Sequence, residues 1–249
     1  MSPMPLLKAL AKAGIGPRRQ LADAIRQGRV EVNGKIVEEF GYPLNLETDH
    51  VSIDKLPIDL KPGQAVYLLL NKPKGVLSTT SDERGRRTVL DILPENYRHL
   101  RLYPVGRLDK ESTGLLLLTN DGELTHRLTH PSFEHEKEYL VSTNATMSAS
   151  EKRRLEQGLG LEDGITHRAI VKEVQAKPFN YSITIHEGRK RQVRRMFECL
   201  GHRILALKRV RMGNIQLGDL REGGIRELSA HEVQALLTDG TEHAKWTSP

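Results

Sequence analysis

The sequence predicts an α+β protein of two domains, a small one at the N-terminus and a larger one after it. The 249 residues suffice for one large or two smaller domains, and an apolar fraction of 37% can supply their cores. Two short helical patterns and a hairpin signal come first, and short apolar runs typical of strands follow. A Pro/Gly-containing stretch at 60–63 separates them. We expect domains at 1–62 and 63–240 and a flexible tail at 241–249.

The first domain is expected to contain two helices and a hairpin. Apolar residues on one helical face predict a helix over 6–13, and Pro17 starts a second helix that ends before Gly28. The dipeptide Asn33-Gly34 between short apolar segments predicts a tight hairpin turn. A further strand is expected at 49–53.

Charge in the first domain is polarised. Residues 1–35 contain seven Lys or Arg and two Asp or Glu, whereas residues 36–62 contain two Lys or Arg and six Asp or Glu. Such a basic face fits either RNA binding or an ordinary solvated helix surface. The order helix, helix, RVEVNG hairpin is similar to the alpha-L RNA-binding domain, named from the fourth small-subunit ribosomal protein. The resemblance implies that Arg18, Arg19 and Arg26 contact RNA, although Pro17 replaces the Ser usual in that domain.

The second domain is expected to consist of short strands and helices. Apolar runs and alternating patterns predict strands, and apolar residues at helical spacing predict helices. The expected strands are at 66–70, 115–118, 137–141, 181–186 and 205–213. The expected helices are at 124–128, 148–157, 193–200 and 233–237, the last preceded by a capping box of Ser229 and Glu232.

A turn at 71–75 follows the first of these strands and is expected to present Lys72 and Lys74 to solvent. A lysine-bearing turn of this kind is usually a solvated loop. It is not a nucleotide-binding loop, because the spacing of Gly, four residues and Gly-Lys-Ser/Thr is absent from the sequence.

The centre of the second domain is the stretch 103–124, which reads YPVGRLDKESTGLLLLTNDGEL. Asp109 lies on a turn that begins at Gly106 and leads into a buried strand, so its carboxylate has a rigid support. This placement suits catalysis. A charged turn that only solvates a loop, or an Asp that caps the turn, explains the same spacing. Glu111 and Asp121 compete for a catalytic role.

Lys137 and Tyr139 are expected on one face of the strand at 137–141, because side chains alternate along a strand. An ordinary strand tyrosine explains this pattern. A phenol also offers a flat apolar face and one hydroxyl.

The densest basic block runs from His186 to Arg211. It holds nine Lys or Arg and two Glu, a net charge of +7 that exceeds the +6 of the whole chain. The basic residues lie at the start of the helix expected at 193–200, where positive charge is unfavourable unless an anion such as phosphate binds. The block therefore favours a nucleic-acid partner.

The sequence argues against a disulfide, a metal site and a membrane anchor. Cys199 is the single cysteine, so no internal disulfide or cysteine-based zinc site is expected. His126, His130 and His135 match no strong metal-binding pattern. The N-terminal stretch fits neither a secretory signal nor a membrane span. We therefore expect a cytoplasmic protein.

Three strings in the second domain closely resemble the conserved blocks of the rRNA pseudouridine synthases of the RsuA/RluB family. They are LNKPKGVLSTTSDERGRRTVLDIL, YPVGRLDKESTGLLLLTNDGEL and EGRKRQVRRM. With the N-terminal domain included, the resemblance extends from Leu6 to about Leu237. It implies a synthase domain whose mainly antiparallel sheet carries the active cleft.

The resemblance also implies roles for single residues. Asp109 is the aspartate of the family's GRLD motif and hence the expected catalytic residue. Tyr139, in the family's KxY element, is expected to lie against the target base and to assist proton removal. Leu207 is expected to pack against the same base.

In the family's third block an arginine pairs with the catalytic aspartate. Arg194 is the first choice here, and Arg189 and Arg195 are the alternatives. The residues of this domain expected to contact RNA are Lys72, Lys74, Arg107, Lys137, Arg189, Lys190, Arg191 and Arg195.

The implied activity is the isomerisation of a specific uridine to pseudouridine in rRNA by a monomeric enzyme. The reaction involves no redox change and no external nucleophile, so neither a cofactor nor a metal is expected. Thr129-His130-Pro131-Ser132 looks more like the large-subunit (23S) branch than the small-subunit (16S) branch.

Two other classes share some of these features. A catalytically silent RNA-binding or ribosome-assembly factor would carry the same basic surfaces, but it would not need the three motifs together. An RNA methyltransferase would need a Gly-rich cofactor loop between a strand and a helix, and the sequence contains none.

Overall fold

The computed structural model describes residues 3–61, 63–130 and 135–238. The chain divides into two compact units. The first runs up to Ala65 and includes Asn120–Gly122, and the second begins at Val66 and contains the rest of the described chain. Pro62 and the tail expected at 241–249 lie outside the described residues.

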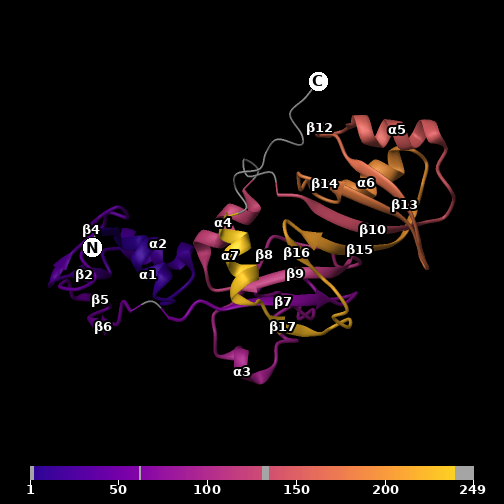
Figure 1. Ribbon diagram of the computed structural model, residues 1–249. Coiled ribbons are helices and arrows are strands. Elements are labelled where there is room, and N and C mark those ends of the chain that lie inside the picture. The colour runs from indigo at the N-terminus through magenta and orange to yellow at the C-terminus, as the bar shows by residue number, and fades with distance from the viewer. Residues whose placement is uncertain (1–2, 62, 131–134, 239–249) are drawn as a thin grey trace. The chain divides into compact units, whose positions relative to one another are not determined.

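The first unit combines two helices with short antiparallel strands (Figure 1). Its elements are β1 (Met4–Pro5), α1 (Leu6–Lys12), α2 (Arg18–Arg26), β2 (Val30–Val32), β3 (Lys35–Ile36), β4 (Pro43–Leu44), β5 (Val51–Ile53) and β6 (Leu56–Ile58). One sheet has the order β3-β2-β5-β6, and β1 pairs with β4. Leu10, Ile25 and Val30 are fully buried in a core that the helices share with the sheet.

The hairpin between β2 and β3 turns at Asn33 and Gly34, whose φ angles are 51° and 76°. Two consecutive residues with positive φ are characteristic of tight hairpin turns, which explains the Asn-Gly pair. The predicted order of helix, helix and hairpin is confirmed, and β5 lies where a further strand was expected.

The second unit is built on one large sheet. Its strands are β7 (Tyr67–Lys72), β8 (Tyr103–Val105), β9 (Thr113–Thr119), β10 (Lys137–Thr143), β11 (Gly160–Leu161), β12 (Gly164–Ile165), β13 (Ile170–Ala176), β14 (Phe179–Ile185), β15 (Ile204–Met212), β16 (Ile215–Gln216) and β17 (Ile225–Glu227). Its helices are α3 (Glu95–Arg98), α4 (Gly122–Thr129), α5 (Ala149–Gln157), α6 (Gln192–Cys199) and α7 (Ala230–Thr238). The main sheet has the order β13-β14-β10-β15-β9-β7-β17, with β8 and β16 paired beside it and β11 paired with β12 separately.

The pairings in this sheet are antiparallel except between β9 and β15. This arrangement confirms the mainly antiparallel sheet that the sequence implied. The capping box expected before the last helix is also present, because Ser229 and Glu232 exchange bonds between side chain and backbone N–H.

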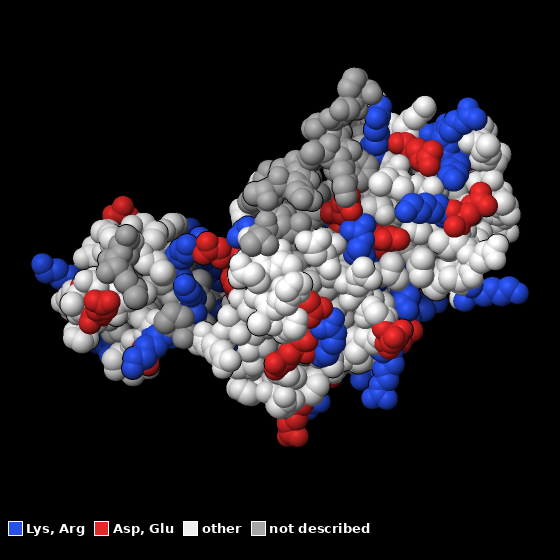
Figure 2. Space-filling view, in the orientation of Figure 1, with Lys and Arg blue, Asp and Glu red and all other residues white. Residues whose placement is uncertain are grey.

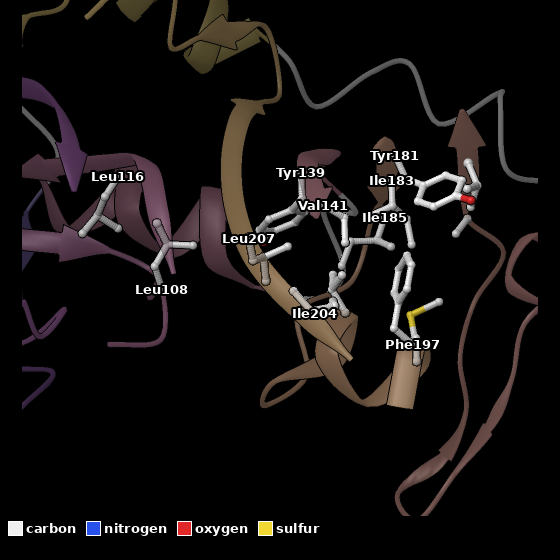
Figure 3. Close-up of a cluster of buried hydrophobic side chains, with 14 of the residues drawn as sticks. Leu108, Leu116, Tyr139, Val141, Tyr181, Ile183, Ile185, Phe197, Ile204 and Leu207 are labelled. Carbon is white, nitrogen blue, oxygen red and sulfur yellow. The ribbon is translucent and has the colours of Figure 1, made fainter. Parts of the chain in front are cut away.

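Both faces of the sheet are covered, which explains the unbroken apolar run Leu115–Leu118 in β9. The first and third of these leucines pack with α4 and α7, whereas the second and fourth belong to a cluster that includes α5, α6 and the segment 76–102. Figure 3 shows part of this second cluster, with side chains such as Tyr139, Leu207 and Phe197. The face that holds Tyr139 also holds the candidate site.

The parallel contact between β9 and β15 is unusually close at Gly114. This residue is the register partner of Arg209 and has a φ angle of 101°. A Cβ atom at position 114 would lie 2.2 Å from the Arg209 carbonyl oxygen. Only glycine therefore allows the two halves of the sheet to join here.

Gly114→Ala is expected to lower the free energy of unfolding by at least about 3 kcal/mol, because the methyl group collides with the β15 backbone at an unfavourable φ. Urea unfolding followed by circular dichroism measures the change. Gly160→Ala is the matched control, since a Cβ there meets no atom within 4 Å. Equal stability of the two variants would contradict the close approach.

Candidate active site

Hydrogen bonds within the turn and from Ser78 fix the turn that carries Asp109. Ser112 N donates to the Asp109 carbonyl oxygen at 3.0 Å. Ser78 Oγ donates to Leu108 O at 3.0 Å and accepts from Leu108 N at 3.1 Å. The turn leads directly into β9, and the Asp109 side chain is 35% exposed. The carboxylate therefore projects from a fixed support into accessible space.

Three buried cations from three different elements bind the chain that follows Asp109. They are Lys72 of β7, Arg194 of α6 and Arg209 of β15, which are 0%, 8% and 2% exposed. The bonds are Lys72 Nζ to Lys110 O (3.4 Å), Arg194 Nη2 to Glu111 O (3.4 Å) and Ser112 Oγ (3.2 Å), and Arg209 Nε to Leu115 O (2.7 Å). Buried charges need polar partners, and the carbonyl groups of this segment supply them.

The burial of Lys72 corrects an expectation from the sequence. Lys72 does not open an exposed turn but ends β7, and its Nζ also donates to Pro73 O at 2.8 Å. Burial lowers the pKa of Lys72 to about 8, although nearby carboxylates oppose the shift. The prediction that Lys72 is exposed on a turn is therefore wrong, whereas Lys74 is exposed as expected.

Arg194 lies next to the catalytic candidate. Its Nε is 3.9 Å from Asp109 Oδ2, which is an ion-pair contact without a hydrogen bond. Burial lowers the pKa of Arg194, and the nearby Arg191 lowers it further, whereas Asp109 opposes the shift. A guanidinium remains charged in spite of such a shift. Asp109 therefore has a positive charge beside it.

The two alternative arginines bind elsewhere. Arg195 makes a bidentate pair with Asp163, with distances of 2.9 and 2.8 Å. Arg189 Nε donates to Glu187 at 2.9 Å, and its other nitrogens donate to the Gly164 and Ile165 carbonyl groups. Both side chains thus hold the β11–β12 hairpin beside α6. Among the three arginines, the described contacts bring Arg194 alone to Asp109.

Asp109, Tyr139 and Leu207 line one pocket of about 200 Å³. Tyr139 comes from β10 and Leu207 from β15, and Val193 of α6 also lines the pocket. Typical ligand pockets have volumes of about 300–1,000 Å³, so this one suits a single small ring rather than a larger molecule. A carboxylate thus shares a small cavity with aromatic and aliphatic surfaces.

Lys137 lines the same pocket two residues before Tyr139, as the strand alternation predicted. Its Nζ donates to the His135 carbonyl oxygen at 2.9 Å. Burial lowers the pKa of Lys137 to about 8, and the positive charge of Arg209 contributes to the decrease. The pocket therefore contains more than one cation near its apolar wall.

Arg209 is a pocket residue that the sequence analysis did not select. Its side chain is almost completely buried and lines the pocket. One signal was available, because Arg209 follows Leu207 by two residues and a strand places such residues on one face. Its burial depends on Gly114, which is far away in sequence.

The remaining RNA-contact candidates are exposed. In the first unit they are Arg18, Arg19 and Arg26, which lie on α2. Arg26 forms an ion pair with Asp23 at 2.8 Å, and its guanidinium carbon is 5.4 Å from the centroid of the Phe40 ring. In the second unit the exposed candidates are Lys74, Arg107, Lys190 and Arg191, of which Lys74 and Arg191 contact Glu111 and Glu198 at 3.3 and 3.7 Å. Basic and acidic side chains are interspersed on the face shown in Figure 2.

No group of three or more His, Cys, Asp or Glu that could hold a metal ion occurs in residues 3–61, 63–130 and 135–238. The rings of His126 and His130 are 4.9 Å apart. In the same ranges no helix is long and apolar enough to cross a membrane.

The sequence matches the RNA pseudouridylate synthase family over residues 66–199 and the S4 domain over residues 4–51. The chain belongs to the RNA pseudouridine synthases, which are isomerases, and it carries an N-terminal S4 domain. The family match includes the Asp109 turn, Tyr139 and the whole of α6.

Relatives of this family are similar over most of the chain. Ribosomal large subunit pseudouridine synthase B of Bacillus subtilis (strain 168) is 40% identical over 235 residues, which cover 93% of this chain and 94% of that protein. The protein of the same name from Vibrio cholerae is 43% identical over 215 residues, which cover 84% and 66%. A crystal structure of a pseudouridylate synthase has a TM-score of 0.67 at 32% identity and covers 94% of this chain and 99% of its own.

Lys72 is expected to contribute stability that grows between about pH 8 and 10.5. Its pKa is about 8 in the folded protein and 10.5 ordinarily, so only the unfolded state binds the proton in this range. The partly buried Lys137 adds a contribution of the same sign to the wild type and the variants alike. Thermal unfolding midpoints across this range should therefore rise more steeply for the wild type than for Lys72→Met.

Lys74→Met is the matched control, because Lys74 is an exposed neighbour. It should keep the pH dependence of the wild type. Parallel curves for the wild type and Lys72→Met would contradict the burial of an ionisable amine at this position.

Proposed function

We propose that this enzyme converts one specific uridine of 23S rRNA to pseudouridine, with Asp109 as the catalytic residue. The observation that carries the proposal is the pocket that Asp109 shares with Tyr139 and Leu207, with Arg194 at 3.9 Å. The Bacillus and Vibrio relatives named ribosomal large subunit pseudouridine synthase B support the choice of RNA. Pro131 and Ser132, which favour the same branch in the sequence, lie outside the described residues.

The proposal gives each domain a task. Residues 1–62 bind rRNA through exposed arginines of α2, and residues 63–240 carry out the reaction. The enzyme acts as a monomer in the cytoplasm, on free rRNA or within an assembling subunit.

The reaction needs an ionised carboxylate and little else. Pseudouridine formation breaks the bond from uracil N1 to ribose C1′, rotates the base and joins uracil C5 to C1′, while the proton on C5 leaves and N1 gains one. Asp109 serves either as the nucleophile that attacks the nucleotide or as the base that removes a proton. Both roles use its charged form, and Arg194 places a positive charge beside it.

The target uridine must leave the RNA stack before it can react. A flipped base needs a flat surface to pack against, and Tyr139 and Leu207 offer aromatic and aliphatic surfaces in the pocket. The Tyr139 hydroxyl is available for proton removal after the base has rotated.

Asp109→Asn is expected to abolish pseudouridine formation, with a rate at least roughly 10³-fold lower, because the amide can neither attack nor accept the proton. The measurement is pseudouridine mapping of unmodified 23S and 16S rRNA, as free RNA and as assembly particles, without added cofactor. Glu111→Gln is the control, since its exposed carboxylate pairs with Lys74. A wild type that binds both RNAs and modifies neither would identify a silent binder, and modification of 16S rRNA alone would move the substrate to the small subunit.

Tyr139→Phe should slow turnover by about 10²-fold and leave RNA affinity nearly unchanged, because the stacking face remains and only the hydroxyl is lost. Single-turnover rates and dissociation constants separate the two effects. Tyr181→Phe is the control, because Tyr181 lies in the same core outside the pocket. An unaltered rate for Tyr139→Phe would remove its role in proton transfer.

Arg194→Gln should lower turnover by about 10²-fold, because the charge beside the Asp109 carboxylate is removed. Arg195→Gln, a neighbouring change on the same helix, should reduce stability through loss of the Asp163 pair and leave turnover almost intact. Kinetics and thermal unfolding of both variants make the comparison. Equal loss of turnover in the two would count against Arg194 as the partner of Asp109.

A further inference from the structure

One nitrogen of Arg209 lacks a partner among the described residues. Nε donates to Leu115 O at 2.7 Å, but Nη2 is buried and makes no hydrogen bond within the described part of the chain. An unsatisfied buried donor costs about 1–3 kcal/mol, so such groups usually have an acceptor that completes them. Arg209 lines the pocket, so a ligand in the pocket can provide this acceptor.

The sheet places Arg209 beside Tyr139. The two residues are register partners across β10 and β15, so their side chains leave the sheet on the same face. On its other side Arg209 is the register partner of Gly114, which has no side chain. The guanidinium therefore has room to extend to Leu115 O while it remains next to the tyrosine.

The burial of the Arg209 side chain indicates which part of a nucleotide can accept its hydrogen bond. A nucleotide that has flipped out of its strand enters a pocket base first, and its phosphates remain on the strand outside. A guanidinium that is only 2% exposed therefore meets the edge of the base and not a phosphate. Uracil has two carbonyl oxygens on its edges, and both are hydrogen-bond acceptors.

We propose that Arg209 binds the target base by donating a hydrogen bond from Nη2 to a carbonyl oxygen of uracil. This inference rests on the proposed function, because it requires the target base to lie against Tyr139. A bond to O4 would also reject cytosine, which carries an amino group at that position, whereas a bond to O2 would accept both bases. The surplus positive charge near Lys137 favours an oxygen acceptor in the same way.

The test compares RNA fragments that contain the uridine mapped with the wild-type enzyme. The target position carries uridine, 2-thiouridine, 4-thiouridine, cytidine or no base. Sulfur is a poor hydrogen-bond acceptor, so the two thio fragments distinguish the two carbonyl groups. Dissociation constants are measured for proteins that also carry Asp109→Asn, so that uridine is not converted during the measurement.

With Arg209 present, one thio fragment and the fragment without a base should bind at least about 10-fold more weakly than the uridine fragment. Arg209→Lys keeps the charge but has one nitrogen in place of three, and it should reduce this difference to about 3-fold or less. Its affinity for the fragment without a base should not change. Lys208→Gln, one residue away on the opposite face, is the control and should retain the full discrimination.

The proposal is overturned if Arg209→Lys loses affinity equally for every fragment, because the side chain would then contact the backbone or only hold β9. It is also overturned if neither thio fragment binds more weakly when Arg209 is present, a result that does not depend on the folding of any Arg209 variant. A wild type that modifies no uridine refutes the proposed function before any fragment is chosen. A wild type that modifies a uridine but discriminates through neither carbonyl group refutes this inference alone.

Discussion

The position of Asp109 depends on three cations that are almost completely buried. Lys72, Arg194 and Arg209 bind carbonyl groups of the short segment after Asp109, and they come from β7, α6 and β15. Each of these charges would be costly to bury without its carbonyl partner, and the turn would be mobile without the three donors. The catalytic candidate and the charges around it therefore stabilise one another, and the site forms only when the second unit is fully folded.

The two sides of the site come from the two halves of the main sheet. Asp109 belongs to the half that contains β7 and β9, whereas Tyr139 and Leu207 belong to the half that contains β10 and β15. The halves meet at the parallel contact between Gly114 and Arg209, where the backbones lie too close for any side chain at position 114. The distance from the carboxylate to the surface that would hold a base is thus set by a contact between backbones, which are stiffer than side chains.

Local patterns were enough to predict the elements around Asp109. A glycine-bounded turn before four leucines predicts a loop residue on a core strand, and the structure has this arrangement. The prediction failed at Lys72, because its burial depends on a bond to Lys110 O, 38 positions away. Arg209 was missed for a related reason, since its burial depends on a strand about 95 positions away. No periodicity within a short window contains such information.

The choice among the three arginines shows the same limit. Sequence order places Arg194 and Arg195 side by side, and family resemblance left both open as partners of the carboxylate. In α6 Arg194 is buried toward Ser112, whereas Arg195 binds the acidic tip of the β11–β12 hairpin. The helix separates adjacent residues by about 100° of rotation. The packing of α6 on the sheet determines that Arg194, and not Arg195, faces the catalytic turn.

The ion pairs at α6 and β15 also determine how much the basic block between His186 and Arg211 contributes to the salt dependence of RNA binding. Arg189, Arg191, Arg194, Arg195 and Arg211 each lie within 4.0 Å of a carboxylate, and Arg209 is buried. The basic residues of the block that have no described contact with a carboxylate and are not buried are Lys190, Arg203 and Lys208. Each phosphate that a protein neutralises releases counterions and adds about 0.9 to the slope of log affinity against log salt for a duplex. The block therefore contributes to salt-sensitive binding as about three charges rather than nine, and most of its arginines organise the protein itself.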